Sequence, residues 1–311
     1  MSRYSTGTSK VVSMADAAAT VPDGAALSFG GFGHFGHPLS FVRELLRQGR
    51  GGFTLHAIAE CWPAELLTAA DRVEHINLSN LMFEGLGRVR AICRAVETGR
   101  ITTDDHSHLG LSLRLLAAGW DMPFMPIRSM VGSDLENIQT GPAPKLRRIQ
   151  SPFSDEQVGV LSPLSPDVAI VHVSEADNQG NGIIHGQISV VDAQVRAAKR
   201  VIMTAERIVD AEEIVRNNQL VTVPGILVDQ VVHSPYGAYP GGMYGLYDED
   251  MELMDQYYDA SRTVEDVEAY LAEWVFGIKD HAEYLDRIGS QRLLEAVVDP
   301  VHMLARGRGE W

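Results

Sequence analysis

The sequence contains very little cysteine: Cys61 and Cys93 are the only two in 311 residues, and they form no CxxC pair. So few thiols exclude a disulfide scaffold and a cysteine-rich metal motif, and we expect both side chains to be buried in a reducing compartment. No uncharged apolar run reaches the roughly 18 residues that a membrane span requires. GxSxG, GxxxxGK[ST] and Cys–His nucleophile motifs are also missing, which argues against the enzyme classes built on them.

Basic residues are scarce too, since 26 Lys and Arg stand against 41 Asp and Glu and the formal net charge is −15. That balance argues against a broad electrostatic surface for nucleic acid or an anionic membrane. Residues 241–311 hold 16 acids and 6 bases, and therefore −10 of the net charge. Such a run is typical of a solvated helical face, with a surface for a basic partner as the alternative. The polar first ten residues contain no apolar signal-peptide core, so we expect a cytoplasmic protein.

Short apolar runs alternate with amphipathic patterns along most of the chain. The predicted strands are residues 25–29, 53–58, 75–78, 168–173, 200–204 and 228–232, with a short extended piece at 124–126. The predicted helices are residues 39–46, 63–70, 88–98, 109–118, 193–198 and 208–216. We expect an α/β fold with a mainly parallel sheet and helices on both faces, because strands that alternate with helices pair in parallel.

Two regions depart from this alternation. Residues 132–166 are rich in Pro, Ser and Gly and poor in periodicity, and we interpret them as a long irregular excursion. From about residue 250 onward the pattern is helical and offers no strand. We therefore predict an α/β domain over residues 10–249 and an acidic helical C-terminal extension over residues 250–311, packed on it.

The most informative segment is FGGFGHFGHP at residues 29–38, called the glycine loop below. Its Gly31, Gly33 and Gly36 satisfy the GxGxxG pattern between a predicted strand and a predicted helix. Glycines there let the backbone approach a ligand closely, and the following helix N-terminus favours negative charge. Glu60, at the end of the next strand, stands where a ribose-binding acid is expected. An NAD-dependent oxidoreductase is therefore one interpretation.

Two details favour a different kind of loop. A dinucleotide fingerprint has its helix already running at the third glycine, whereas here His37 and Pro38 delay the helix. The doublet that begins at Gly30 and the bulky Phe32 and Phe35 are typical of an open loop shaped over a ligand. A dinucleotide loop and a plain structural turn remain the alternatives.

Residues at the ends of the second and third predicted strands are further site candidates. Glu60 ends one strand, and Ser79 and the Phe83-Glu84-Gly85 triplet follow the next. Open α/β sheets bind ligands outside the carboxyl ends of their strands, which is the edge where these residues are expected. The alternative for Glu60 is a structural hydrogen-bond partner. Glu84, directly before a glycine, is the nearest approach to an active carboxylate in the chain.

Four other side chains admit both a functional and a structural interpretation. Asp105 precedes a predicted helix and is either a general acid, base or substrate-orienting group, or a helix cap. His34 and His37 either contact a substrate carboxylate, or are an exposed loop residue and a cap residue respectively. Arg128 pairs either with a carboxylate ligand or within a structural ion pair. The histidines are too scattered for a metal site, and we expect none.

Three long stretches of the sequence resemble the A subunits of family I coenzyme A transferases, most closely those of the glutaconate type. The early stretch is DGAALSFGGFGHFGHP at residues 23–38, similar to the family's strand, GGF loop and proline. The middle one is DDHSHLGLSLRLLAAGWDMPFMPIRSMVGSDL at residues 104–135. The late one consists of VPGILVDQVVHSPYGAYPGGMYGLYDEDMEL at residues 223–253 and EAYLAEWVFGIKDHAEYLDRIGSQRL at residues 268–293. Together they follow the family's order over nearly the whole chain.

The resemblance implies an α/β architecture shared by two homologous subunits that meet at one active site. It implies an obligate partner, the B subunit, in a heterotetramer or larger assembly, and coenzyme A as a substrate with no tightly bound cofactor. In this family a glutamate of the B subunit performs the attack on an acyl-CoA thioester, and CoA passes through a glutamyl intermediate to a small carboxylic or dicarboxylic acid. The nucleophile is therefore expected on the partner chain.

Within this chain we expect the loop from Gly30 to Gly36 to line the acyl pocket, with backbone N–H groups that hold an oxyanion. Phe32 and Phe35 would exclude the water that hydrolyses an acyl-glutamyl anhydride. The aromatic segments PYGAYP and YGLYD are interpreted as packing and subunit-interface elements. The nucleotide end of CoA is expected near the glycine loop, near residues 145–148 or on the partner, away from the acidic tail.

Other chemistries on the same scaffold stay open at this point. They are CoA-thioester hydrolysis, carbon–carbon bond cleavage and decarboxylation, and Asp105 is one position where such a change could reside. A non-catalytic partner subunit with a degenerate site is a further alternative.

Overall fold

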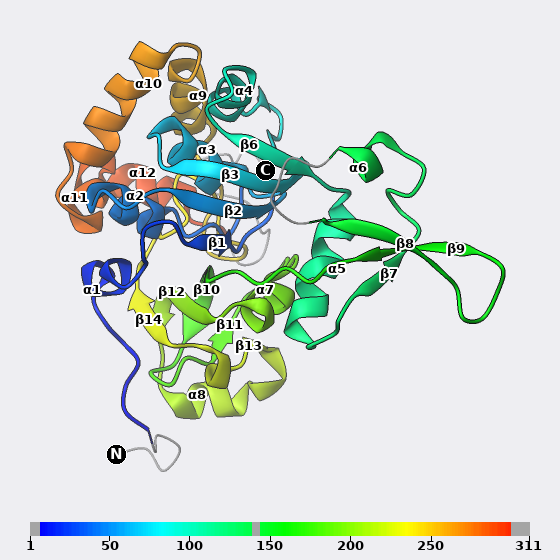
Figure 1. Cartoon of the computed structure of the whole chain (residues 1–311). Helices are drawn as coiled ribbons and strands as arrows, with labels where there is room; N and C mark the ends of the chain where they lie inside the picture. The colour runs from blue at the N-terminus through cyan, green and yellow to red at the C-terminus, as the bar shows by residue number, and fades with distance from the viewer. Residues whose placement is uncertain (1–6, 139–143, 300–311) are drawn as a thin grey trace.

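The computed structural model describes residues 7–138 and 144–299, which fold around one large β-sheet (Figure 1). Within these residues seven strands run parallel, in the spatial order β6, β3, β2, β1, β10, β12 and β14. Their bounds are Thr102–Asp105, Val73–Ser79, Phe53–Ile58, Ala26–Phe29, Val168–Ala176, Arg200–Ile208 and Gln230–His233. The antiparallel β11 (Gly182–Ile183) and β13 (Val221–Val223) extend the sheet beside β10. The predicted α/β fold with a mainly parallel sheet is confirmed.

The order of the strands reverses at β1. The chain builds the sheet outward from β1 through β2, β3 and β6, and then returns to place β10 on the other side of β1. Ligands of open α/β sheets bind outside the carboxyl ends of the strands at such a switch point. The glycine loop begins there, because it follows directly on Phe29, the last residue of β1.

Helices cover both faces of the sheet (Figure 1). The strand register pairs Ile170 with Ile202 and Val171 with Met203, and these two pairs enter different apolar clusters because side chains alternate along a strand. One layer contains α1 (Met14–Ala19), α2 (Leu39–Arg47), α3 (Cys61–Ala69) and α4 (Arg90–Glu97). The other contains α5 (His108–Gly119) and α7 (Val191–Ala197).

Helices also follow the last strand of the sheet. They are α9 (Met251–Ala260), α10 (Val264–Leu271), the π-helix η3 (Ala272–Phe276), α11 (His281–Ile288) and α12 (Ser290–Ala296), as the predicted helical extension requires. Tyr257 of α9 packs against Trp62 of α3, with ring centroids 5.1 Å apart, and α9, α10 and η3 share the core of the first layer. The buried side chains of α11 and α12 belong to a separate apolar cluster. The domain boundary at residue 250 stays a prediction, and residues 300–311 lie outside the described residues. No helix in the two described ranges is both long and apolar enough to cross a membrane.

A buried carboxylate joins α3 to α4. Glu65 of α3 is fully buried and accepts hydrogen bonds from the N–H groups of Ala91 and Ile92, at 2.8 and 3.1 Å, in the first turn of α4. Desolvation raises the pKa of Glu65 to about 7, although these hydrogen bonds favour the charged form. The carboxyl group therefore titrates near neutral pH in the folded protein.

The free energy of unfolding is expected to fall as the pH rises through this range. The folded protein holds the Glu65 proton more tightly than the unfolded chain does, so this contribution to stability is complete below pH 4.5 and is lost as the pH rises through about 7. The loss amounts to about 3 kcal/mol, measured by urea unfolding at about pH 4 and about pH 8. Glu65→Gln does not titrate and should lack this part of the pH dependence; an unchanged pH dependence in the variant would contradict the assignment.

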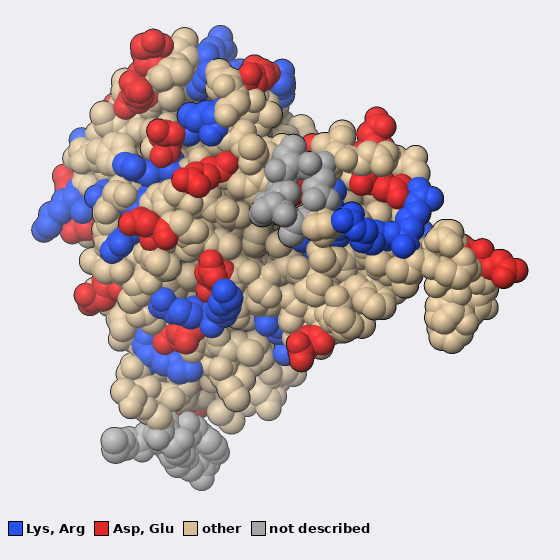
Figure 2. Space-filling view, in the orientation of Figure 1, with Lys and Arg blue, Asp and Glu red and all other residues tan. Residues whose placement is uncertain are grey.

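The prediction of an irregular excursion over residues 132–166 is wrong for part of its length, because these residues contain two of the three strands of a small antiparallel sheet. The strands β7 (Met125–Ile127), β9 (Gln157–Leu161) and β8 (Leu146–Gln150) pair in that order, and the short helix α6 (Asp134–Asn137) precedes β8. We call this sheet the arm, because it projects from the body of the molecule (Figure 1, Figure 2). Four of the five β8 residues are exposed, so no apolar alternation marks the strand in the sequence.

Two other elements differ from their predictions. Residues 102–105 (TTDD) form β6, which the sequence analysis missed because the strand has no apolar side chain. Asp105 therefore ends a strand and does not cap a helix; Ser107 caps α5 by accepting a hydrogen bond from the N–H of Gly110 at 3.0 Å. The helix predicted over residues 208–216 begins later, because β12 continues to Ile208 and α8 spans Ala211–Arg216.

Candidate active site

The glycine loop turns back on itself at the carboxyl end of β1. Phe32 and Phe35 exchange backbone hydrogen bonds of 2.9 and 3.0 Å, which closes a tight turn. Gly31, Gly33 and Gly36 have φ angles of +111°, +61° and +71°, a region that residues with side chains rarely occupy. Phe32 and Phe35 are both half-buried, so the turn presents apolar surface at the edge of the sheet.

His37 braces the loop from inside. Its ring is fully buried, and Nδ1 and Nε2 lie 2.9 and 2.8 Å from the carbonyl oxygens of Gly30 and Gly33. Burial lowers the pKa of His37 to about 4, against the effect of the two carbonyl oxygens, which favour the protonated ring. His37 does not cap α2, whose N-cap position is Pro38, so its interpretation as a cap residue is wrong.

Several backbone N–H groups of the loop are engaged within the fold. Those of Gly30, Phe32, Gly33, Phe35 and Gly36 all donate to backbone carbonyl oxygens. The Gly30 amide reaches β10 and the Gly33 amide reaches Ala59 at the end of β2, so the loop spans the switch point of the sheet. These five N–H groups are therefore not available to hold an oxyanion, and the expected role falls to the remaining N–H groups of the loop.

The segment of residues 236–249, called the wall below, packs on the glycine loop. The N–H of Gly242 donates to the carbonyl oxygen of His34 at 3.1 Å, and the rings of Phe35 and Tyr244 stack with centroids 4.6 Å apart. The aromatic residues of this segment are predicted from the sequence to be packing and interface elements, and their position beside the loop is not predicted. The available signal was the Pro-Gly-Gly sequence inside it, which is typical of closely approaching backbones.

His34 and Glu249 form a pair between the loop and the wall. His34 is only 4% exposed, and its Nδ1 lies 2.8 Å from Oε2 of Glu249. The interpretation of His34 as an exposed loop residue is therefore wrong. Among the described residues its Nε2 has no hydrogen-bond partner, so one nitrogen of a fixed ring is uncommitted in this chain. Glu249 is not predicted from the sequence, because it belongs to an acidic run without a motif.

The neighbours Phe83 and Glu84 have different surroundings. Phe83 closes β4 (Met82–Phe83), which pairs with β5 (Gly87–Arg88), and its ring is buried 5.0 Å from that of Trp62. Glu84 is exposed, and its Oε2 would lie 3.0 Å from a Cβ atom placed on Gly33. The structure thus brings the Glu84 carboxylate to the glycine loop and leaves Phe83 in the core.

Glu60 and Ser79 lie at the ends of β2 and β3, next to the loop. Glu60 pairs with Gly33 through a β-bridge, and the N–H of Ala59 donates to the carbonyl oxygen of Ser79 at 3.2 Å. Both side chains are buried, and their oxygens have no hydrogen-bond partner among the described residues. Burial raises the pKa of Glu60 well above its ordinary value, which favours a neutral carboxyl group.

Asp105 lies apart from the glycine loop along the sheet. It ends β6, three strand positions from β1, which is roughly 14 Å at the usual spacing of strands. Its carbonyl oxygen accepts a hydrogen bond of 2.7 Å from Nζ of Lys145, whose side chain is buried. Lys145 therefore anchors the arm to β6, although it belongs to the basic stretch expected near the nucleotide end of CoA.

Two basic residues of the arm have carboxylate partners within the chain, whereas the exposed Arg147 of β8 donates to the carbonyl oxygen of Leu146. Arg128 pairs with Glu156 at 2.8 Å, which favours its interpretation as part of a structural ion pair. Arg148 pairs with Glu136 at 2.5 Å. The arm is therefore not a row of uncommitted cations for a polyphosphate.

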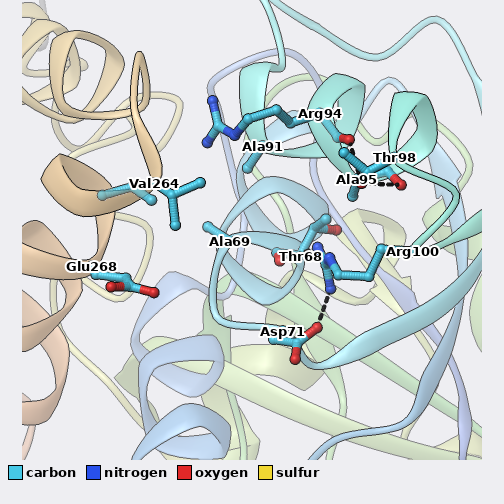
Figure 3. Close-up of a pocket in the computed structure, with 11 residues that line it drawn as sticks. Thr68, Ala69, Asp71, Ala91, Arg94, Ala95, Thr98, Arg100, Val264 and Glu268 are labelled. Carbon is cyan, nitrogen blue, oxygen red and sulfur yellow. Dashed lines mark hydrogen bonds and ion pairs between the residues drawn. The ribbon is translucent and has the colours of Figure 1, made fainter.

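A separate cavity of about 310 Å³ lies between α3, α4 and α10 (Figure 3). It opens at the amino ends of β3 and β6, because its lining residues Asp71 and Arg100 shortly precede these strands. Arg100 pairs with Asp71, and Arg94 donates to the carbonyl oxygen of Ser261 at 2.8 Å. Since Arg100 and Asp71 of this cavity pair with each other and it lies at the opposite sheet edge, we place the candidate active site at the glycine loop.

The candidate active site thus combines one loop, one wall and the ends of two strands. Its residues are Gly30, Gly31, Phe32, Gly33, His34, His37, Glu60, Ser79 and Glu84 from the sequence analysis, with Tyr244 and Glu249 added by the structure. Within the described residues no group of three or more His, Cys, Asp or Glu side chains is arranged to hold a metal ion.

Comparison with known proteins identifies the family. The family model described as Coenzyme A transferase matches residues 11–234, more than half of the chain. The chain belongs to the coenzyme A transferase family. It is 35% identical to the A subunit of glutaconate CoA-transferase from Acidaminococcus fermentans, over 94% of this chain and 96% of that protein. It is 30% identical to the A subunit of 3-oxoadipate CoA-transferase from Pseudomonas knackmussii, over 86% of this chain and 94% of that protein.

Solved structures agree with this assignment to the coenzyme A transferases. The crystal structure of glutaconate coenzyme A-transferase from Acidaminococcus fermentans matches with a TM-score of 0.91 and 34% identity, over 96% of this chain and 98% of that chain. A variant of the decarboxylase AibA/AibB matches with a TM-score of 0.74 and 30% identity, over 85% of this chain and 100% of that chain. The family accounts for the glycine loop without a dinucleotide, and α2 begins only at Leu39, three residues after Gly36.

Proposed function

We propose that this chain is the A subunit of a two-chain enzyme that moves CoA between an acyl-CoA and a small carboxylic or dicarboxylic acid. The observation that carries the proposal is the glycine loop at the switch point of the sheet, braced by His37 and lined by the wall. Two relatives support it, because each is named as the A subunit of a CoA-transferase for a dicarboxylic acid.

The nucleophile in this proposal is a glutamate of a homologous B chain. Its carboxylate oxygen attacks the thioester carbonyl and expels CoA as the thiolate, which leaves an acyl-glutamyl anhydride. The thiolate then attacks the glutamyl carbonyl, so the first acid leaves and CoA stays on the enzyme as a thioester. The carboxylate of the second acid attacks this thioester, and the released thiolate takes up the new acyl group and frees the glutamate. Every bond that breaks is replaced, so no oxidant or reductant is needed.

This chain would shape the pocket in which these steps occur. Phe32 and Phe35 shield the anhydride from water. The N–H groups of the glycine loop that are not engaged within the fold face the thioester carbonyl oxygen, which becomes negatively charged during the attack. In this proposal His34, whose Nδ1 lies 2.8 Å from Oε2 of Glu249, contacts a substrate carboxylate through its other ring nitrogen. Glu60 is closed to solvent, which makes Glu84 the carboxylate of this set that a substrate could reach directly.

The test is co-expression with the homologous B chain, followed by CoA transfer assays with a panel of acyl-CoA donors and small acids. After incubation with acyl-CoA alone, borohydride reduces an enzyme-bound thioester to an alcohol, and peptide mass spectrometry locates the modified glutamate. Modification of a B-chain glutamate together with CoA transfer supports the proposal. Release of free CoA or of CO₂ without transfer would instead indicate a hydrolase or a decarboxylase.

Glu84→Gln in this chain tests the same proposal and is compared with replacement of the B-chain glutamate. Because Glu84 is proposed to border the pocket and not to carry CoA, the variant complex should keep its transferase activity within about tenfold of wild type. Replacing the modified B-chain glutamate by Gln should remove the activity. Steady-state kinetics of both complexes make the comparison, with Asp105→Asn as a second acid-to-amide control. Loss of activity and of the borohydride label in Glu84→Gln would move the nucleophile to this chain.

A further inference from the structure

The arm is built as an exposed ribbon. In β8 only Leu146 is buried, and in β9 the buried residues lie at the end nearest the body of the molecule. The outer half of the ribbon has no covering element among the described residues, and it projects into solvent (Figure 2). Isolated two-stranded ribbons are marginally stable in water.

The outer end of the arm carries apolar side chains. Phe153 at the hairpin tip is 95% exposed, and Ile149 of β8 is 38% exposed. Ile149 lies directly opposite Val158 of β9, so their side chains share one face of the ribbon. Large aromatic side chains that are exposed in one chain and enter a pocket of another are typical centres of protein–protein interfaces.

The base of the arm adjoins the candidate active site. The hydroxyl oxygens of Ser129, just after β7, and Ser107, at the start of α5, lie 2.6 Å apart. The ring of the next residue, His108, faces Phe32 of the glycine loop, with centroids 6.3 Å apart. The arm and the glycine loop therefore meet at the start of α5, on the carboxyl edge of the sheet.

We infer that the arm holds the homologous B chain in place over the glycine loop, with Phe153 buried in the surface of that chain. The inference rests on the proposed function, in which a carboxylate of the B chain must reach the loop. A chain seated on Phe32 covers the start of α5, and the arm extends from the same place. The surface that the B chain must occupy for catalysis is thus continuous with the arm. A second copy of this chain is the alternative occupant.

Two tip variants and one control test the inference. Phe153→Ser removes the aromatic ring. Replacement of residues 151–156 by Asn-Gly removes the tip while a two-residue turn closes the hairpin at the paired Gln150 and Gln157. The control is Ile226→Ser, because Ile226 is 92% exposed but lies in η2 (Gly225–Leu227), outside the arm. Surface plasmon resonance gives the Kd between each full-length variant of this chain and the B chain, and analytical ultracentrifugation gives the size of the assembly.

Both tip variants should raise the Kd for the B chain by roughly 30-fold, whereas Ile226→Ser should stay within about threefold. Wild-type affinity in both tip variants would overturn the inference. An intact two-chain pair that no longer forms the larger assembly would also overturn it and would assign the arm to a second copy. A wild-type chain that binds no B chain at all would overturn it as well. A wild-type complex of the two chains without CoA transfer would count against the proposed function alone and leave the role of the arm standing.

Discussion

Gly31→Ala is expected to lower the activity of the assembled enzyme by at least about 100-fold, because it displaces the glycine loop that shapes the site. A Cβ atom on Gly31 would lie 2.2 Å from Nδ1 of His37 and 2.8 Å from the carbonyl oxygen of Phe35. The fully buried His37 ring cannot move aside without breaking its contacts to Gly30 and Gly33. The same clash, with φ at +111°, should lower the free energy of unfolding by about 4 kcal/mol.

Gly24→Ala is the matched control for backbone strain alone. Gly24 also has a positive φ, +74°, but no atom lies within 4 Å of its added Cβ. Its cost should be about 1 kcal/mol, with activity unchanged within about twofold. Urea unfolding and steady-state kinetics measure both variants. If Gly31→Ala kept more than about a tenth of wild-type activity, the loop would not need the shape seen here.

Glu206→Ala should lower the free energy of unfolding by about 4 kcal/mol, because Glu206 accepts hydrogen bonds from several buried donors at once. This residue of β12 is 7% exposed, and its carboxylate lies 2.6 Å from Nε2 of His172 and accepts a hydrogen bond of 2.5 Å from the hydroxyl of Tyr247. It also accepts hydrogen bonds from the N–H groups of Tyr236 and Gly237, at 2.6 and 3.0 Å. Removing it leaves all four partners buried without their acceptor and loosens the wall from the sheet.

Arg207→Ala is the control on the same strand. Arg207 is largely exposed and pairs with Glu175 at 2.9 Å, so its loss should cost less than about 1 kcal/mol. Glu206→Gln, which keeps the size of the side chain and one acceptor oxygen, should fall between the two. Chemical unfolding ranks the three variants, and the model of the network fails if Glu206→Ala is no less stable than Arg207→Ala.

The sheet could be predicted where its strands are buried on both faces. The run VAIVHV within β10 does not alternate between apolar and polar residues, because the strand is buried against an apolar cluster on each face of the sheet. By contrast, β6 (TTDD) and β8 (LRRIQ) owe their conformation to hydrogen bonds with neighbouring strands. Their sequences show no apolar alternation, so the local pattern could not have revealed these two strands.

The candidate site divides in the same way. The glycine loop could be predicted because its glycines permit backbone angles that other residues avoid. The pair of His34 and Glu249 could not, because 215 positions separate the two residues and only the folded chain brings them together. The same is true of Tyr244, whose ring has no distinguishing context in the sequence until it stacks on Phe35.

The position of the wall in the chain has a consequence for exchanging parts between relatives. The match to the family model ends at residue 234, and the last described strand of the sheet ends at His233. The wall begins only at residue 236, yet it forms one side of the candidate site. A chimaera that exchanges residues 11–234 would therefore inherit the whole scaffold of one parent and half of the pocket of the other. The end of the match to the family model and the end of the segment that forms the candidate pocket therefore do not coincide in this protein.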